Sequence, residues 1–544
     1  MKNNMNRVIC LVLATIFLIS TNAFALKTNN NIVENDNEVN EINDNEVNTV
    51  TRFIKSQFKN YESKTTFSEQ DDIDPLVDLA VTVTIKDIRA LGKIDRIGNP
   101  NFYVKILING VEHTSPIWRN QNYVKPNWSV TQDVPDDKEF VNITIQLWDK
   151  NIGVSKICDI SPISEEGGYM DDYDVDLMYS LKSGHWTGDD YNYPTSPNMF
   201  DPSGYGRLNG CDDNSIYQND RDCELWFDIT QNDYDGDGIP YWTEVNVFHT
   251  DPTVDNRGED PDGDGVPIEW EHKWGHYFSF DWHHGTVENK WMYDPFVWED
   301  HRHMDPDNDG LTNYEEYLTS QWDSDPFRKD LFIELDQMEE SPRGEKSLLT
   351  EGSKNLLRDA YDRQNIAYHL DDGSWKDSGS DMIPFDESTD NYELRNIYET
   401  YFLHGDQNNW RRGVFHYGLL IYNSSFFRGF AFSGDGNGTN CFQISSKGVN
   451  KVLPFPKIQV MRDMGFASVY MHETGHTLGI FNAGVDNKLT VFPNRLWLKF
   501  LNYRSCMNYA YTYLLVDYSD GSRGKYDFDD WGRLDLTSFE AEFF

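Results

Sequence analysis

The segment YMHETGHTLGIFNAGVDN, residues 470–487, decides how the C-terminal part of the chain is interpreted. His472 and His476 stand four residues apart, and Glu473 follows the first of them. The residues around them predict a long helix, on which side chains four positions apart share one face, so both imidazoles can reach one zinc ion. Glu473 is turned away from that face enough to hold a water molecule rather than the metal. The segment therefore predicts a zinc site with a general base beside it.

Residues outside this pair sharpen the prediction. Gly479 falls three residues after His476, where a helix must end sharply if the chain is to double back beneath the metal. No glutamate occurs between residues 474 and 539, which excludes a third ligand from a glutamate on a closely following helix. The later stretch YRSCMNYAY contains Met507 and Tyr509.

With these motifs, residues 328–544 resemble the metzincin clan of zinc endopeptidases. The resemblance implies an α/β (α+β) catalytic domain in which His472 and His476 are zinc ligands and Glu473 is the general base. It also implies that Met507 forms the floor beneath the metal and that Tyr509 binds the metal or the developing oxyanion. The stretch RGFAFSGDGN, residues 428–437, is similar to the clan's edge strand, which pairs with an extended substrate.

The third zinc ligand departs from the clan's pattern. Asn482 stands where the clan has a third histidine or an occasional aspartate, and a neutral amide is a poor zinc ligand. Our hypothesis is that the turn is lengthened and that Asp486 supplies the third ligand. The alternatives are Asn482 itself, a water molecule, or a ligand from elsewhere, such as an acidic residue of YSDGSRGKYDFDDWG, residues 518–532.

Residues 231–327 contain an internal repeat of three acidic loops. Each loop has Asp at positions 1, 3 and 5, Gly at 6 and Glu at 12, a spacing that presents carboxylates to one calcium ion. The predicted calcium ligands are Asp233, Asp235, Asp237 and Glu244; Asp260, Asp262, Asp264 and Glu271; and Asp305, Asp307, Asp309 and Glu316. The loops resemble thrombospondin type-3 repeats of extracellular proteins, and we expect about three structural Ca²⁺ ions.

An aromatic insertion between the second and third loops contains six of the 14 histidines of the chain. His272 and His276 are four residues apart and could share a second transition metal. Histidines interleaved with tryptophan, tyrosine and phenylalanine more often serve packing, and we favour packing here.

Residues 73–230 contain short alternating runs such as LAVTVTIKDI, residues 79–88, which predict an antiparallel β-sandwich. The pair GNPNFYVKI and IQLWDKN resembles the C2-type calcium- and lipid-binding sandwich. Asn101 and Asn151 replace aspartates of that family, although Asp95 and Asp149 remain. A structural or substrate-positioning module is therefore favoured over a calcium- or lipid-binding one.

The N-terminal residues predict export. Residues 1–25 have a basic start, an apolar run and a small-residue cleavage site, which indicate a signal peptide, and residues 26–72 have the composition of a disordered segment. No later segment is apolar enough to span a membrane. Because export favours pairing of cysteines, we expect disulfides between Cys211 and Cys223 and between Cys441 and Cys506, with Cys158 left over.

The composition is strongly acidic, with 91 acidic and 47 basic residues among 544 and a net charge of −44. Nucleic acid is therefore an unfavourable partner and cations are favourable ones. The sequence predicts a secreted multidomain protein that uses zinc to hydrolyse protein or peptide substrates and is stabilised by calcium. The alternatives are a calcium-dependent surface or adhesion protein with an inactive protease-like domain, and another zinc hydrolase that acts on esters or amides.

Overall fold

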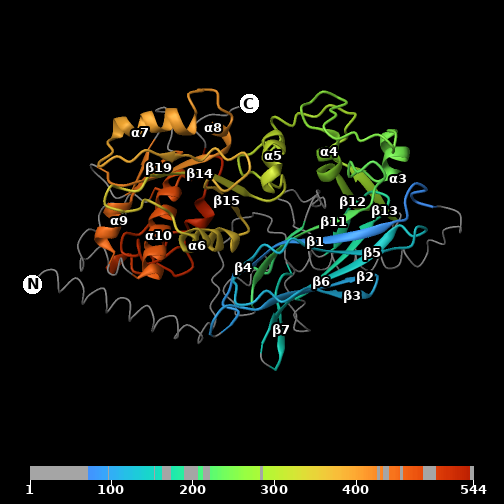
Figure 1. The fold of residues 1–544 in the computed structure, drawn as a ribbon, viewed down its shortest axis with the longest axis horizontal. Coiled ribbons are helices and arrows are strands. Elements are labelled where there is room, and N and C mark those ends of the chain that lie inside the picture. The colour runs from blue at the N-terminus through green and yellow to red at the C-terminus, as the bar shows by residue number, and fades with distance from the viewer. Residues whose placement is uncertain are drawn as a thin grey trace, which may run out of the picture.

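The computed structural model describes residues 72–538 except for 96, 152, 162–172, 189–205, 212–220, 282–285, 425–428, 433–439, 454–457 and 482–497 (Figure 1). The signal peptide, nearly all of the acidic segment, Asn482 and Asp486 lie outside the described residues. Within them, no helix combines the length and the apolarity that crossing a bilayer requires.

Residues 80–231 form two antiparallel sheets that face each other, so the predicted β-sandwich is present. The first sheet has the order β10-β11-β1-β4, with β5 also paired to β1, and the second has the order β3-β2-β6-β8-β9, with β7 paired to β6. The first contains β1 (Ala80–Ala90), β4 (Tyr123–Val124), β5 (Trp128–Asp133), β10 (Gly206–Asn209) and β11 (Cys223–Gln231). The second contains β2 (Phe102–Ile108), β3 (Val111–Thr114), β6 (Phe140–Lys150), β7 (Ser155–Cys158), β8 (Val175–Ser180) and β9 (Trp186–Gly188).

The sandwich forms because its strands alternate. On β1, the side chains of Val81, Val83 and Ile85 are fully buried, whereas the threonines between them are only half-buried. A strand points successive side chains to opposite faces, so this alternation gives one apolar face that must pack against another sheet.

The acidic loops are each followed by a short helical segment. These segments are α3 (Tyr241–Thr243) with the π-helical turn η1 (Glu244–Phe248), α4 (Ile268–Gly275), and α5 (Asn313–Thr319) with η2 (Ser320–Trp322). The hairpin of β12 (His276–Asp281) and β13 (Thr286–Trp291) lies between the last two. Val266, Trp270 and Trp274 are part of the apolar core of the sandwich, so this segment packs against the sandwich.

The C-terminal part is built on a mixed sheet with the order β15-β14-β17-β19-β18, in which β16 also pairs with β14. Its strands are β14 (Asp330–Met338), β15 (Ala367–Asp371), β16 (Met382–Ile383), β17 (His416–Ile421), β18 (Gly429–Phe432) and β19 (Cys441–Ser445). All neighbours are parallel except β18, which runs antiparallel to β19. The predicted edge strand is therefore β18, at the end of this sheet.

Helices cover both faces of the sheet (Figure 1). One face carries α6 (Glu351–Asp362), α9 (Ser446–Val452) and α10 (Gln459–Thr477); the other carries α7 (Asn391–Ile397), η3 (Tyr398–Phe402) and α8 (Arg411–Val414); η4 (Trp531–Arg533) lies near the C-terminus. Leu331, Ile333 and Leu335 of β14 point to the α10 face, whereas Phe332 between them points to the α7 face. The sheet is thus buried on both sides, as parallel sheets usually are.

Polar contacts join this sheet to the rest of the molecule at the start of β14. The backbone N–H of Asp330 donates to Asp309 Oδ2 of the third acidic loop at 2.7 Å. Arg207 Nη2 of β10 lies 3.3 Å from Asp330 Oδ1, and both side chains are buried. Further along, Arg89 of β1 pairs with Asp362 of α6 at 3.1 Å.

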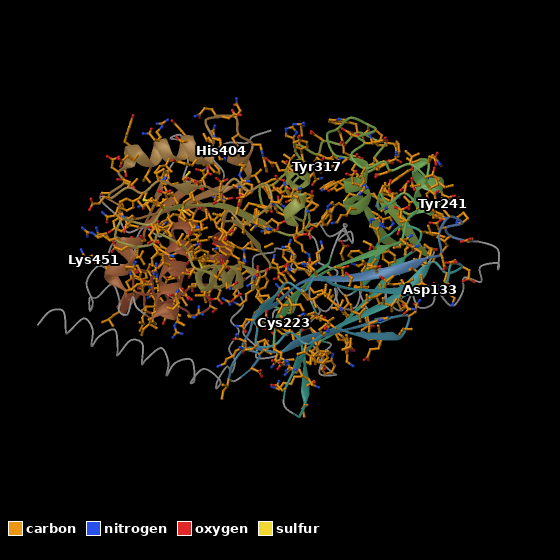
Figure 2. All side chains as sticks on the ribbon, in the orientation of Figure 1. Asp133, Cys223, Tyr241, Tyr317, His404 and Lys451 are labelled. Carbon is orange, nitrogen blue, oxygen red and sulfur yellow. The ribbon has the colours of Figure 1, made fainter. Side chains whose placement is uncertain are left out.

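The expected disulfides are not formed, since all five described cysteines are buried thiols. In the register of β10 and β11, Asn209 pairs with Glu224, which places Cys211 and Cys223 on opposite faces of the sheet. Cys441 lies in the core of the α7 face and Cys506 in the core of the α10 face. Burial and the neighbouring Cys158 thiol instead raise the pKa of the Cys223 thiol, which is labelled in Figure 2.

Candidate functional site

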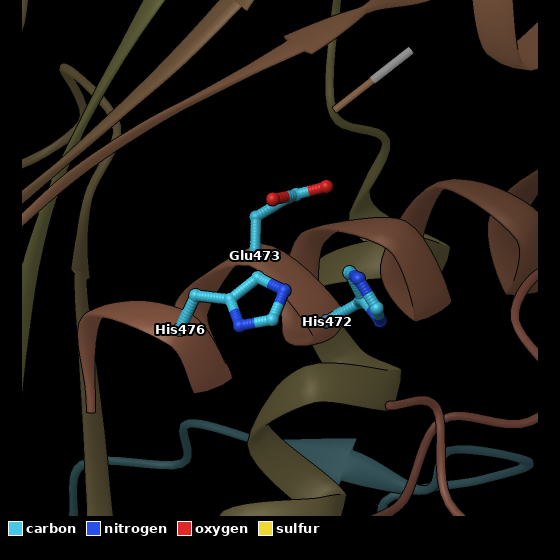
Figure 3. Close-up of side chains that lie close together, drawn as sticks. All are labelled: His472, Glu473 and His476. Carbon is cyan, nitrogen blue, oxygen red and sulfur yellow. The ribbon is translucent and has the colours of Figure 1, made fainter. Parts of the chain in front are cut away.

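Helix α10 brings His472, Glu473 and His476 together (Figure 3). One ligand atom from each of the three side chains can be chosen so that all lie within 4.8 Å of one another. The two imidazole rings stand edge to face with centroids 4.8 Å apart. The geometry therefore agrees with the prediction that both imidazoles point to one position and that the carboxylate lies beside it.

Backbone carbonyls set the tautomer of both imidazoles. His472 Nδ1 donates to the carbonyl of Cys506, and His476 Nδ1 donates to the carbonyl of Ile480, each at 2.9 Å. Because a carbonyl oxygen can only accept, both rings carry their hydrogen on Nδ1 and their lone pair on Nε2. Such outer partners orient imidazoles that bind metals.

Burial keeps these histidines neutral. It lowers the pKa of His472 to about 3, with a further contribution from the nearby His476, and it lowers the pKa of His476 as well. Neutral imidazole is the form that binds a metal, so the site is in its ligand form at physiological pH.

Helix α10 ends at a glycine and packs on a methionine. Gly479 has a φ of +80°, and the N–H of Ile480 donates to the carbonyl of Gly475 at 2.8 Å, which is a Schellman ending. A Cβ on Gly475 would lie only 2.7 Å from Met507 Sδ. Helix and methionine are therefore in close contact, and a side chain at Gly475 would require Met507 to shift.

Tyr509 and the edge strand border the same position. The ring of Tyr509 lies 5.4 Å from that of His472 and is partly exposed. On β18, a Cβ at Gly429 would lie 2.1 Å from Glu473 Oε1, so the strand backbone passes directly over this carboxylate. An extended chain lying along β18 would pass close to Glu473.

The third ligand is not identified, because Asn482 and Asp486 both lie outside the described residues. In the stretch 518–532, Asp527 accepts a hydrogen bond from Ser519 Oγ at 2.6 Å, and Asp530 accepts one from Tyr503 at 3.0 Å. These two carboxylates stabilise the C-terminal loops. Asp486 stays a prediction.

The three acidic loops share one pattern of hydrogen bonds. In each loop the aspartate at position 1 accepts from the Gly N–H at position 6, at 3.1, 3.0 and 3.1 Å. The aspartate at position 5 accepts from the N–H at position 7, at 2.8, 3.1 and 2.8 Å. The glycines at position 6 have φ values of +93°, +105° and +97°, which other residues rarely adopt. The repeat seen in the sequence is therefore a repeat of structure.

The same oxygens lack a partner in each loop. Oδ2 of the aspartate at position 3 is buried without a hydrogen bond in all three loops, as is at least one oxygen of the glutamate at position 12. These oxygens belong to Asp235, Asp262, Asp307, Glu244, Glu271 and Glu316. Buried carboxylate oxygens are costly without a partner, and a divalent cation would provide one.

Electrostatics agrees with this interpretation. Burial, reinforced by the neighbouring carboxylates, raises the pKa of Glu244 to about 8 and that of Glu271 to about 10, and it also raises the pKa of Glu316. Without a cation these groups would hold protons that a carboxylate in water releases. The acidic clusters can hold metal ions, and the residues present fit them.

The sandwich residues that correspond to the calcium loops of the C2 family are arranged differently. Asp149 is fully buried, accepts from the N–H of Asn101 at 2.9 Å, and also accepts from the side-chain amide of Asn151. The Asp149 carboxylate thus accepts hydrogen bonds from the Asn101 backbone and from the Asn151 side chain. This arrangement favours a structural role for the sandwich.

The rings of His272 and His276 pack on a third histidine, as favoured from the sequence. His272 Nε2 donates to the carbonyl of Ser183 at 3.0 Å, so it has no lone pair to offer there. Both rings pack on the buried ring of His185, with centroids 4.7 and 4.4 Å away.

The sequence did not single out His301, which lies with Asp264, Glu271 and Glu299 in one cluster of ligand atoms. The available signal was the closing HRH of the insertion, residues 301–303.

No protein-family model matches this chain, and no curated protein matches it. Solved structures similar to part of it include a human group IVD cytosolic phospholipase A2 in complex with methyl γ-linolenyl fluorophosphonate (10% identity, TM-score 0.16). That similarity covers 28% of this chain and 17% of the phospholipase, so only a small part of the enzyme is matched. A C2 domain (8% identity, TM-score 0.17) and a C2 domain of a plant extended synaptotagmin (13%, 0.16) are each matched over 28% of this chain and 98% and 95% of their own lengths. At these scores the similarity carries no argument, and the sandwich is defined by its own strands.

Proposed function

We propose that this chain is a secreted, calcium-stabilised zinc endopeptidase that hydrolyses protein or peptide substrates. The observation that carries the proposal is the pair of neutral, carbonyl-oriented imidazoles of His472 and His476 beside the buried carboxylate of Glu473. The close fit of Met507 under Gly475 and the edge strand over Glu473 support it.

Zn²⁺ held by His472 and His476 would act as a Lewis acid and lower the pKa of water at the site towards neutrality. Glu473 would accept a proton from the attacking water and deliver it to the departing amine nitrogen. Tyr509, beside His472, would donate a hydrogen bond to the developing oxyanion. An extended peptide would pair with β18, which would carry its scissile bond past Glu473.

Calcium is the cation proposed for the loops. Hard carboxylate oxygens at this spacing suit Ca²⁺, and calcium is abundant outside the cell. Such ions would hold together carboxylates that otherwise repel one another.

The deciding experiment compares the wild type with Glu473→Gln in hydrolysis of casein or gelatin. We expect hydrolysis to require zinc and to fall by about 10²- to 10⁴-fold in the variant, since general-base catalysis contributes that much. Bound zinc should be unchanged, because the two imidazoles remain. Glu339→Gln, at an exposed glutamate after β14, is the matched control and should keep wild-type activity.

The alternative of an inactive adhesion protein predicts no hydrolysis by the zinc-loaded wild type. The alternative of an ester or amide hydrolase predicts that small esters or amides are cleaved while proteins are not. Either result would contradict the peptidase proposal.

A further inference from the structure

A second metal cluster lies on the buried side of the second acidic loop. It contains Asp264, Glu271, Glu299 and His301, and one ligand atom from each lies within 4.8 Å of all the others. Helix α4 supplies Glu271, and the end of the aromatic insertion supplies Glu299 and His301. Only Asp264 and Glu271 belong to the loop motif seen in the sequence.

The imidazole of His301 points at the carboxylates. Its Nε2 lies 3.2 Å from Asp264 Oδ2 and 3.6 Å from Glu271 Oε1, and all three side chains are 0% exposed. Neither contact is a hydrogen bond, and both oxygens of Glu271 and Oε2 of Glu299 are also buried without a hydrogen-bond partner. The ring nitrogen and the three carboxylates therefore lie close together without hydrogen bonds between them.

The two distances from His301 are compatible with ligands that share one ion. Ligand atoms about 2.0 to 2.2 Å from a common ion stand roughly 3 to 3.5 Å apart when they are neighbours in its shell. The two distances from His301 Nε2 fall in or close to this range. A dication would give the buried oxygens of Glu271 and Glu299 the partner that they lack.

Asn313, at the start of α5, contacts the other nitrogen of the His301 ring. Its side-chain Nδ2 lies 3.0 Å from His301 Nδ1, and the residue is fully buried. In this orientation the amide donates to Nδ1 and the ring hydrogen is on Nε2. Turning the amide over exchanges its oxygen and nitrogen, so that Oδ1 accepts from Nδ1–H and the Nε2 lone pair faces the carboxylates. Metal-binding histidines usually have an outer partner of this kind.

The other two loops differ in donor chemistry. The clusters of the first loop (Asp233, Asp235, Asp237, Glu244) and of the third loop (Asp305, Asp307, Asp309) contain oxygen donors. Imidazole favours first-row transition metals, whereas all-oxygen sets favour Ca²⁺ and Mg²⁺. We propose that Asp264, Glu271, Glu299 and His301 form a second transition-metal site, separate from the α10 site, that takes Zn²⁺ or a similar first-row divalent ion. This site shares Asp264 and Glu271 with the second loop, so the ion would take the place of the Ca²⁺ expected there.

The test uses the full chain with His472→Ala and His476→Ala, which removes both imidazoles of the α10 site. This double variant is loaded with Zn²⁺ in saturating Ca²⁺ and dialysed, and its metals are measured by mass spectrometry. We expect about one zinc per chain to remain. Adding His301→Ala should abolish it, whereas His303→Ala, two residues on with a 72% exposed side chain, should retain it.

A further variant covers the case in which His301→Ala does not fold. His301→Asp makes the donor set all-oxygen, so zinc should be lost while calcium is bound and the far-ultraviolet circular dichroism is kept. Co²⁺ in place of Zn²⁺ should give visible absorption bands in the double variant that disappear with His301→Asp.

Two results would overturn the inference: a folded double variant that binds calcium only, or a His301→Ala variant that keeps its zinc. The proposed peptidase is tested separately. Its failure would appear as a zinc-loaded wild type without hydrolytic activity, whatever the zinc content of the double variant.

Discussion

The acidic loops and the α10 site are organised in opposite ways. Each loop draws its motif from twelve consecutive residues, and the same hydrogen bonds recur in all three. The α10 site needs a helix, the turn around Met507 and the edge strand at Gly429, which lie far apart along the chain. A local site is therefore a property of its motif, whereas a dispersed site depends on the packing of the whole sheet.

Calcium removal should have the largest effect if the loops are cation sites. A ligand at 100 to 1,000 times its dissociation constant stabilises the native state by about 2.7 to 4.1 kcal/mol per site, so emptying the loops should lower the melting temperature strongly. Chelation with EGTA should also increase tryptic cleavage within 233–326. The Glu473→Gln variant is used so that self-digestion does not contribute, and an unchanged melting temperature would contradict the calcium assignment.

The dispersed site should be sensitive to a single methyl group. Gly429→Ala places a Cβ against Glu473, and a displacement of about 1 Å in a catalytic group can reduce kcat about 100-fold. The melting temperature should change little, because β18 is an edge strand. Gly92→Ala is the control, since its Cβ would meet nothing closer than 3.6 Å. Equal activity of both variants would show that β18 takes no part in the reaction.

Glu244→Gln should change stability in opposite directions with and without calcium. With Ca²⁺ the variant loses a ligand and should be less stable. Without Ca²⁺, at a pH above the Glu244 pKa of about 8, it loses a buried charge and should be more stable by about 1 to 3 kcal/mol. Urea unfolding in both conditions measures the difference, and destabilisation of the same size in both would show that Glu244 binds no cation.

The pH dependence should differ between the calcium-free and calcium-bound forms. The pKa of Glu244 is raised from 4.5 to about 8 in the cation-free fold, so the native state holds more protons than the unfolded state between these values. Stability of the calcium-free protein should therefore fall as pH rises through this window, by up to about 1.4 kcal/mol per pH unit for each such group. With calcium bound the slope should largely vanish, and equal slopes in the two forms would contradict this origin.

Prediction from sequence succeeded where spacing along the chain determines geometry. The alternation of Val81, Val83 and Ile85 indicated the sandwich, and the four-residue spacing of His472 and His476 placed their ligand atoms close together. The disulfide pairs were wrong because pairing depends on which face each cysteine takes, and the register of β10 and β11 separates Cys211 from Cys223.

His301 was missed for a related reason. It follows Asp264 by 37 positions, and only the packing of the aromatic insertion against α4 and α5 returns it to the loop. The carbonyl groups that accept hydrogen bonds from the two α10 histidines could not be predicted either, because every residue has a backbone carbonyl whatever its type.

The hydrogen bond from the Asp330 N–H to Asp309 Oδ2 bears on how the molecule can be divided. A fragment that begins at residue 328 would keep the whole mixed sheet but would lack the acceptor for the backbone N–H of Asp330, the first residue of β14. It would also leave the Asp330 carboxylate without Arg207. We therefore expect a fragment truncated at this boundary to fold poorly by itself, and the mixed-sheet part is best produced together with the acidic loops.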